Sequence, residues 1–301
     1  MAGSAISGTA MQSVDPARWR SNLREREAAP LAVLLHATAS TGGQWKSLTA
    51  WLAPSHLVLA PDLPGYGSAA AQGGEAGDLL ADAAPTIALI EKRGAPAHLV
   101  GHSYGGAVAL AIAMSRPELV RSLSLIEPVA FYLLRDGDTG DRRLQREVLL
   151  VADRIRAAIA AGTPEPGMAS FIDFWNGGGS WARLDPARQA QLCGQIGRVA
   201  ANFAAIAAEP CRLAQIRSIR CPTLLIRGER SPEPVRRIIG ILAAAITRGA
   251  RLVEIPNAGH MAPLTHSQFV DPVIADHIVE AEDGAGAADE PQRIAAANFR
   301  Y

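Results

Sequence analysis

Six short, continuous apolar runs, separated by longer helical stretches, constrain the fold of this chain more than any other feature. A run that is apolar at every residue suits a strand buried on both faces, and such strands belong to parallel sheets that helices cover on each side. The runs occupy residues 30–36, 56–62, 97–103, 121–128, 221–228 and 250–256. Their alternation with helical stretches therefore predicts an α/β protein with a mostly parallel sheet.

Residues 131–215 interrupt this alternation. They have helical periodicity, as in "LQREVLLVADRIRAAIAAG", and contain no apolar run of comparable strength. We therefore expect a helical insertion over the carboxyl edge of the sheet, which divides the chain into a core (1–130 plus 216–301) and a helical cap (131–215). The last residues, rich in glycine, alanine and charge, are expected to form a poorly packed tail.

The composition limits the classes of function. The chain has 301 residues, 49% of them hydrophobic and 19% charged, which is enough for a large core. Its formal net charge is zero, so neither nucleic acid nor a membrane surface is an expected partner. No signal-like start or bilayer-length apolar stretch is present, and a cytoplasmic location is the expectation. The three cysteines show no paired spacing and are expected to be reduced and structural: Cys193, Cys211 and Cys221.

The stretch "LVGHSYGG" carries the clearest chemical signal. Its core, from Gly101 to Gly105, matches the pattern G-x-S-x-G, in which a sharp strand-to-helix turn exposes a serine hydroxyl at the sheet edge. Here the pattern follows a predicted strand and opens an alanine-rich helical stretch, which is the context that the turn requires. We therefore predict that Ser103 is a nucleophile.

A serine hydroxyl is a weak nucleophile until a base takes its proton, so a histidine is required. His260, in "PNAGHMAP", follows the last predicted strand at the sheet edge where ligand sites of α/β proteins gather, and His266 is the second choice. His36 is expected to brace the loop that it begins, and His102 to point away from the attack site. The remaining histidines lie near the ends of elements and are assigned surface or packing roles: His56, His98 and His277.

Four loops together resemble those of the α/β-hydrolase family with a helical cap: "HATASTGGQW", "APDLPGYG", "GHSYGG" and "AGHMAPLTH". The resemblance implies an eight-stranded, mostly parallel sheet, whose first two strands would fall within residues 13–28. It also implies that the backbone N–H groups of Thr38 and Tyr104 form an oxyanion hole. Ala37 stands where the family usually has glycine, and an alanine fits there while its φ stays negative.

The acid of the catalytic triad is less obvious. The family usually places it three residues after the glycine that ends the seventh strand, but that position here is Ser231, which cannot balance an imidazolium. Glu127 ends the predicted strand 121–128, beside the nucleophile strand, and some relatives carry their acid there. We hypothesise that Glu127 is the acid, with Glu229 and Glu233 as alternatives.

The resemblance implies acyl transfer to water. A serine nucleophile excludes the chemistry of haloalkane dehalogenases and epoxide hydrolases, which form an ester on an aspartate. We therefore predict a serine hydrolase of small or medium apolar acyl esters, without cofactor or metal, with thioesters and lactones left open. A cofactor-free perhydrolase or haloperoxidase-like activity, and a ligand receptor on the same fold, remain alternatives. The oligomeric state is left open.

Aromatic residues of the expected insertion are candidates for contact with the substrate. The stretch "FIDFWNGGGSW" would form an apolar wall beside a flexible glycine segment if it faces the sheet. Alternatively, these aromatic residues form a small core of the insertion itself. The predicted substrate-binding residues are Phe131, Phe174, Trp175, Trp181 and Met261.

Overall fold

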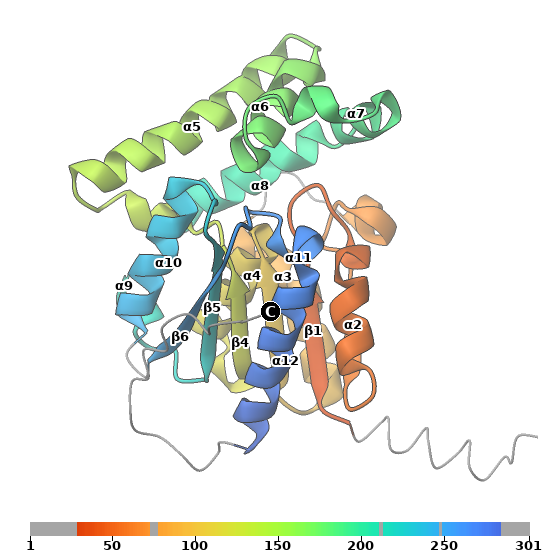
Figure 1. The fold of residues 1–301 in the computed structure, drawn as a ribbon, viewed down its shortest axis with the longest axis vertical. Coiled ribbons are helices and arrows are strands. Elements are labelled where there is room, and N and C mark those ends of the chain that lie inside the picture. The colour runs from red at the N-terminus through yellow and green to blue at the C-terminus, as the bar shows by residue number, and fades with distance from the viewer. Residues whose placement is uncertain (1–28, 73–77, 211–212, 247–248, 284–301) are drawn as a thin grey trace, which may run out of the picture.

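One parallel sheet forms the centre of the molecule. The computed structural model describes residues 29–72, 78–210, 213–246 and 249–283 (Figure 1). Six strands lie in the order β2-β1-β3-β4-β5-β6, and every neighbouring pair is parallel. The strands are β1 (Leu31–Leu35), β2 (Leu57–Leu59), β3 (Ala97–His102), β4 (Val120–Ile126), β5 (Thr223–Gly228) and β6 (Ala250–Ile255). Each predicted apolar run contains or overlaps one of them, which confirms the α/β prediction.

The resemblance implies eight strands, and the part of the chain that the structure describes contains six. The two strands expected within residues 13–28 lie outside the described residues, and so does the expected tail beyond residue 283.

Helices cover both faces of the sheet. Helices α3 (Leu79–Arg93), α4 (Tyr104–Ser115) and α10 (Glu233–Ala245) pack on one face, and α2 (Lys46–Leu52) and α12 (Ser267–Asp283) on the other. Successive side chains of β1 alternate between the two cores, because neighbouring residues of a strand point to opposite faces. β1 is consequently apolar and buried at every residue.

The segment between β4 and β5 is helical, as predicted. Figure 1 shows α5 to α8 above the carboxyl ends of the strands. The described part of residues 131–215 contains no strand. The helices are η4 (Phe131–Leu134), α5 (Thr139–Ala160), α6 (Pro164–Asn176), η5 (Trp181–Arg183), α7 (Pro186–Cys193), α8 (Ile196–Ala208) and α9 (Leu213–Ile216). The division of the chain into core and cap domains stays a prediction.

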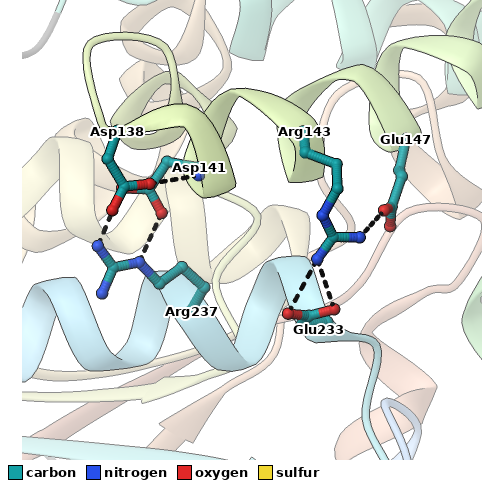
Figure 2. A network of polar contacts seen from close by, with 6 residues as sticks. All are labelled: Asp138, Asp141, Arg143, Glu147, Glu233 and Arg237. Carbon is teal, nitrogen blue, oxygen red and sulfur yellow. Dashed lines mark hydrogen bonds and ion pairs between the residues drawn. The ribbon is translucent and has the colours of Figure 1, made fainter.

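Ion pairs tie α5 to α10 of the core (Figure 2). The guanidinium of Arg237 donates to both carboxylate oxygens of Asp141, at 2.6 and 2.9 Å, and this hydrogen bonding lowers the pKa of Asp141. Asp138 caps the start of α5 by accepting the Asp141 backbone N–H. Arg143 donates to both oxygens of Glu233, at 3.0 and 3.1 Å. These contacts join the start of α5 to α10.

The remaining elements are short: η1 (Gly42–Trp45), η2 (Gly67–Gln72), η3 (Pro117–Leu119) and α11 (Ala262–Thr265). Among the described helices, none combines the length and apolarity that crossing a bilayer requires. Cys193 and Cys221 are free thiols, and Cys211 lies outside the described residues.

Candidate active site

Ser103 lies in the sharp turn between β3 and α4, with φ 55° and ψ −116°. Positive φ is strained for a residue with a side chain, so the surroundings must hold the turn. A Cβ at Gly101 would lie 2.4 Å from the carbonyl oxygen of Gly105, and one at Gly105 would lie 2.3 Å from that of Leu35. The flanking glycines are therefore a steric requirement of the turn, as the G-x-S-x-G pattern implies.

His260 follows β6 and reaches the serine. Its Nε2 lies 3.0 Å from the Oγ of Ser103, and its Nδ1 lies 2.6 Å from Oε2 of Glu127. All three side chains are buried, and the glutamate is inaccessible to solvent. The structure thus brings the three residues predicted for the triad into one hydrogen-bonded chain at the carboxyl end of the sheet.

Glu127 uses both of its carboxylate oxygens. While Oε2 faces His260, Oε1 accepts the backbone N–H of Gly228 at 2.6 Å and the hydroxyl of Ser231. A carboxylate buried without such partners would be strongly destabilising. Ser231, at the family's usual acid position, is therefore a hydrogen-bond donor to the Glu127 carboxylate.

The alternative residues are engaged elsewhere. Glu233 pairs with Arg143 at the protein surface (Figure 2). Glu229 accepts the backbone N–H of Asn257 at 2.8 Å. The Nδ1 atom of His266, the second choice for the base, lies 2.8 Å from the hydroxyl of Thr265.

A relay of hydrogen bonds holds the His260 loop against the loop after β1. Burial, together with the neighbouring His260, keeps the pKa of His102 well below its usual value, so its ring is neutral. The His102 Nε2–H donates to the His260 carbonyl at 2.8 Å, and its Nδ1 accepts from the Gln44 amide at 3.0 Å. The Oε1 of Gln44 in turn accepts the N–H of Ala37 at 3.1 Å. The elbow histidine thus positions two functional loops at once.

The two residues predicted for the oxyanion hole are Thr38, in the loop after β1, and Tyr104, at the start of α4. Tyr104 is the first residue of α4, and the first N–H groups of a helix have no partner within it. Ala37 is not among the residues with positive φ, whereas Ala39, two residues later, has φ 59°. The alanine at the usual glycine position is therefore tolerated. His36 braces this loop, as expected, because its Nε2 accepts the Leu63 N–H at 2.9 Å.

Helix α8 of the inserted segment supports the same loop from above. Asn202 is buried, and its Oδ1 accepts the hydroxyls of Thr38 at 3.2 Å and Tyr66 at 2.5 Å. Arg198, one turn earlier, pairs with Asp82 of α3, which also accepts the hydroxyl of Tyr104 at 2.5 Å. Burial raises the pKa of Tyr104, so this phenol stays a neutral donor. Sequence reasoning missed these supporting residues, which have no motif of their own.

Trp175 of α6 covers the histidine. Its ring stacks on that of His260 with centroids 3.9 Å apart and an interplanar angle of 23°. Phe131 stacks on Trp175 at 6.2 Å, and Phe174 meets it edge-on at 4.8 Å. Trp181 is buried in η5, but no ring contact among the described residues joins it to this stack. Met261 follows His260 in the chain and is half-buried.

A cavity of about 500 Å³ lies beside this stack, between η4, α5 and α8. Its wall is mainly apolar and shares Phe131 with the stack, while Arg135, Gln145 and Arg156 add polar groups. The apolar residues of the wall include Phe131, Tyr132, Val148, Ala152, Phe203 and Ala204. Its volume falls within the range of small-molecule sites.

Comparison with known proteins identifies the family of this chain. The model of the "Alpha/beta hydrolase family" matches residues 32–272, which is most of the chain. The chain therefore belongs to the α/β-hydrolase family. A hydrolase from Pseudomonas aeruginosa PA01 superposes with a TM-score of 0.68 at 23% identity, covering 83% of this chain and 90% of that one. At this identity the likeness shows the fold alone.

Curated relatives match over shorter segments. The dihydrolipoyllysine-residue acetyltransferase component of the acetoin cleaving system of Cupriavidus necator is 34% identical over 110 residues, 36% of this chain and 29% of that protein. Lipase LipV of Mycobacterium tuberculosis is 30% identical over 166 residues, 53% of this chain and 54% of its own length. The chain thus spans about half or less of these relatives.

Proposed function

We propose that this enzyme is a serine hydrolase of apolar acyl esters and works through Ser103, His260 and Glu127. The observation that carries the proposal is the hydrogen-bonded chain from the Ser103 hydroxyl through the imidazole to the buried carboxylate. A nucleophile, a base and an acid in this order, at a strand-to-helix turn, are the parts that acyl transfer to water needs. The lipase among the relatives supports an ester substrate.

In the proposed mechanism, His260 Nε2 takes the hydroxyl proton while Ser103 Oγ attacks the ester carbonyl. The oxyanion is stabilised by the N–H groups of Thr38 and Tyr104. The Glu127 carboxylate stabilises the imidazolium, and the hydrogen bonds that it accepts from Gly228 and Ser231 keep it in position. His260 then protonates the leaving alkoxide, which leaves an acyl group on the serine. A water molecule, activated by the same imidazole, releases the acid.

Access to the serine requires the helical segment to move. Ser103 is 5% exposed and His260 2%, and the indole of Trp175 lies on the imidazole. We infer that the end of α6 shifts when substrate binds, because Gly177 and Gly178 follow it in open space, where a Cβ on either would meet no heavy atom within 4 Å. The acyl chain then passes Phe131 into the apolar cavity. In this proposal the inserted helices act as a cap that selects the acyl group.

An active-site-directed fluorophosphonate tests the nucleophile. We expect covalent labelling at Ser103 and hydrolysis of nitrophenyl esters by the wild type. In Ser103→Ala, which the turn accommodates, labelling should disappear and kcat/KM should fall by about 10⁴-fold or more, because triad residues act as a unit. Ser180→Ala, at a buried serine of the helical segment, is the matched control and should keep both the covalent labelling and the ester hydrolysis. Ester hydrolysis at the wild-type rate by folded Ser103→Ala would exclude the proposal.

A further inference from the structure

A second cluster of histidine and glutamate side chains lies at the amino end of the sheet, opposite the catalytic residues. His56 directly precedes β2, His98 is the second residue of β3, and Glu282 lies in the last turn of α12. The Nε2 atoms of both histidines lie 3.6 Å from the same oxygen, Oε1 of Glu282. The ligand atoms of the three residues all lie within 4.8 Å of one another.

Both Nε2 atoms are buried without a hydrogen-bond partner in the described part of the chain. The side chains of His56 and His98 are only 2% and 0% exposed, and that of Glu282 is 24% exposed. A distance of 3.6 Å is too long for a hydrogen bond, so the carboxylate does not satisfy either ring. Buried polar atoms are nearly always paired, and two orphaned nitrogens that face one carboxylate therefore require an explanation.

The other nitrogen of each ring is fixed by a serine. The Nδ1 atom of His56 lies 2.8 Å from the hydroxyl of Ser55, and that of His98 lies 2.7 Å from the hydroxyl of Ser122. When each hydroxyl accepts the Nδ1–H, each Nε2 keeps a free lone pair and lies 3.6 Å from the carboxylate oxygen. Histidines that bind metals have this arrangement, in which the second ring nitrogen donates to a neighbour that orients the ring.

We propose that His56, His98 and Glu282 bind a divalent transition-metal cation of the zinc class. Two imidazole nitrogens and one carboxylate oxygen are donors that Zn²⁺ accepts in tetrahedral sites, with bonds of about 2.1 Å. Such bonds place neighbouring ligand atoms about 3.4 Å apart in a tetrahedron, close to the 3.6 Å between each nitrogen and the carboxylate oxygen. A water molecule fills the fourth position.

The bound metal has a structural role. Helix α12 begins shortly after the His260 loop and runs from the carboxyl end to the amino end of the sheet (Figure 1). A cation between Glu282 and the two histidines joins the last turn of this helix to β2 and β3. Because binding occurs only in the folded state, the metal raises the stability of the whole core.

Zinc titration of the full chain, after removal of metals with EDTA, tests the proposal. We expect calorimetry to show one tight equivalent of Zn²⁺, Co²⁺ to give the visible absorption of a four-coordinate site, and excess Zn²⁺ to raise the Tm by about 3 to 6 °C. Glu282→Gln should weaken Zn²⁺ binding by about 100-fold and remove the Tm increase. His98→Gln should have the same effect on binding.

The matched control is Glu280→Gln, two residues earlier on the same helix, where the carboxylate pairs with Arg251 at 3.1 Å. This variant should bind Zn²⁺ like the wild type. Since Glu282 is partly exposed, Glu282→Gln is expected to fold even if the buried His98 variant does not. The proposal is overturned if the wild type binds no stoichiometric Zn²⁺. It is also overturned if Glu282→Gln binds Zn²⁺ undiminished, because the ion then sits elsewhere, for example at His260.

Discussion

At the carboxyl end of the sheet, Glu127 and His260 form a closed set of hydrogen bonds, whereas at the amino end His56, His98 and Glu282 face one another at distances too long for any. Both clusters are built from the same two residue types, and each has a member in, or next to, a strand of the one sheet: His98 in β3 and Glu127 directly after β4. At the carboxyl end, each glutamate oxygen and each imidazole nitrogen has a partner within the protein. The amino end leaves two ring nitrogens without one in the described part of the chain.

The difference concerns how a buried polar cluster is stabilised. Hydrogen bonds within the protein satisfy the carboxyl end, so its geometry is fixed before the substrate arrives, as electrostatic stabilisation of a transition state requires. In the site proposed at the amino end, the protein supplies two nitrogen atoms and one oxygen atom, and a bound cation completes the cluster. The first arrangement suits catalysis on a substrate that binds and leaves, and the second suits a metal ion that stays bound.

The largest effect is expected from a substitution of Glu127, the proposed acid. Glu127→Gln keeps the shape of the side chain but removes the charge that stabilises the imidazolium, so kcat for ester hydrolysis should fall by about 10³-fold or more at neutral pH. Glu229→Gln and Glu233→Gln serve as controls and should retain nearly all activity. If Glu127→Gln stays active while one of these two loses its activity, the acid comes from the segment "GERSPEP" instead.

An intermediate effect is expected where the helical segment meets the catalytic end. Trp175→Ala removes the ring that covers His260, and we expect the ratio of kcat/KM between long and short acyl esters to change by about tenfold. Trp181→Ala is the matched control, because both tryptophans are 7% exposed and only Trp175 stacks on His260. A uniform loss for all chain lengths, with a lowered Tm in both variants, would show that Trp175 only fills the core of the segment.

The smallest effect concerns neutral histidines at the carboxyl end. Burial lowers the pKa of His36 and His102 below the usual 6.5, and protonation would set an N–H against a donor, Leu63 N–H or the Gln44 amide. Below pH 6.5 these two histidines therefore bind more protons in the unfolded chain than in the folded state. The free energy of unfolding consequently falls as the pH drops below 6.5. The slope per group is at most about 1.4 kcal/mol per pH unit.

Urea unfolding between about pH 7.5 and about pH 5.5 measures this loss, because carboxylates are mostly ionised in both states over that range. His102→Gln keeps an amide that can donate to the His260 carbonyl but cannot titrate, so its pH-dependent loss should be smaller than that of the wild type. Equal free energies of unfolding for the wild type at both pH values would contradict the prediction.

The sequence predicts those parts of the structure that local pattern determines. The six strands follow from continuous apolar runs, and the place of Ser103 follows from glycines that the turn requires sterically. The place of His260 follows from its position after the last strand. Glu127 can be proposed because it ends the strand beside the nucleophile, but its contact with Ser231 depends on the pairing of β4 with β5.

Other parts depend on contacts between residues far apart in the chain. Asn202 supports Thr38 across 164 positions, and the Gln44 relay joins three loops. His56, His98 and Glu282 have no metal-binding spacing, so the sequence indicates only surface or packing roles for the two histidines and predicts no metal. The three side chains come close together only because α12 packs along the sheet.

If Glu127 is the acid, as we propose, its contact with Ser231 lets positions 127 and 231 exchange the acid during evolution without a stage that lacks one. A chain with carboxylates at both positions would bring two like charges together, and one of them would take up a proton. The histidine would still face one ionised group, and either acid could afterwards be lost. A lineage of hydrolases can thus move its acid from one strand to the next by two single substitutions, while the nucleophile and the base stay where they are.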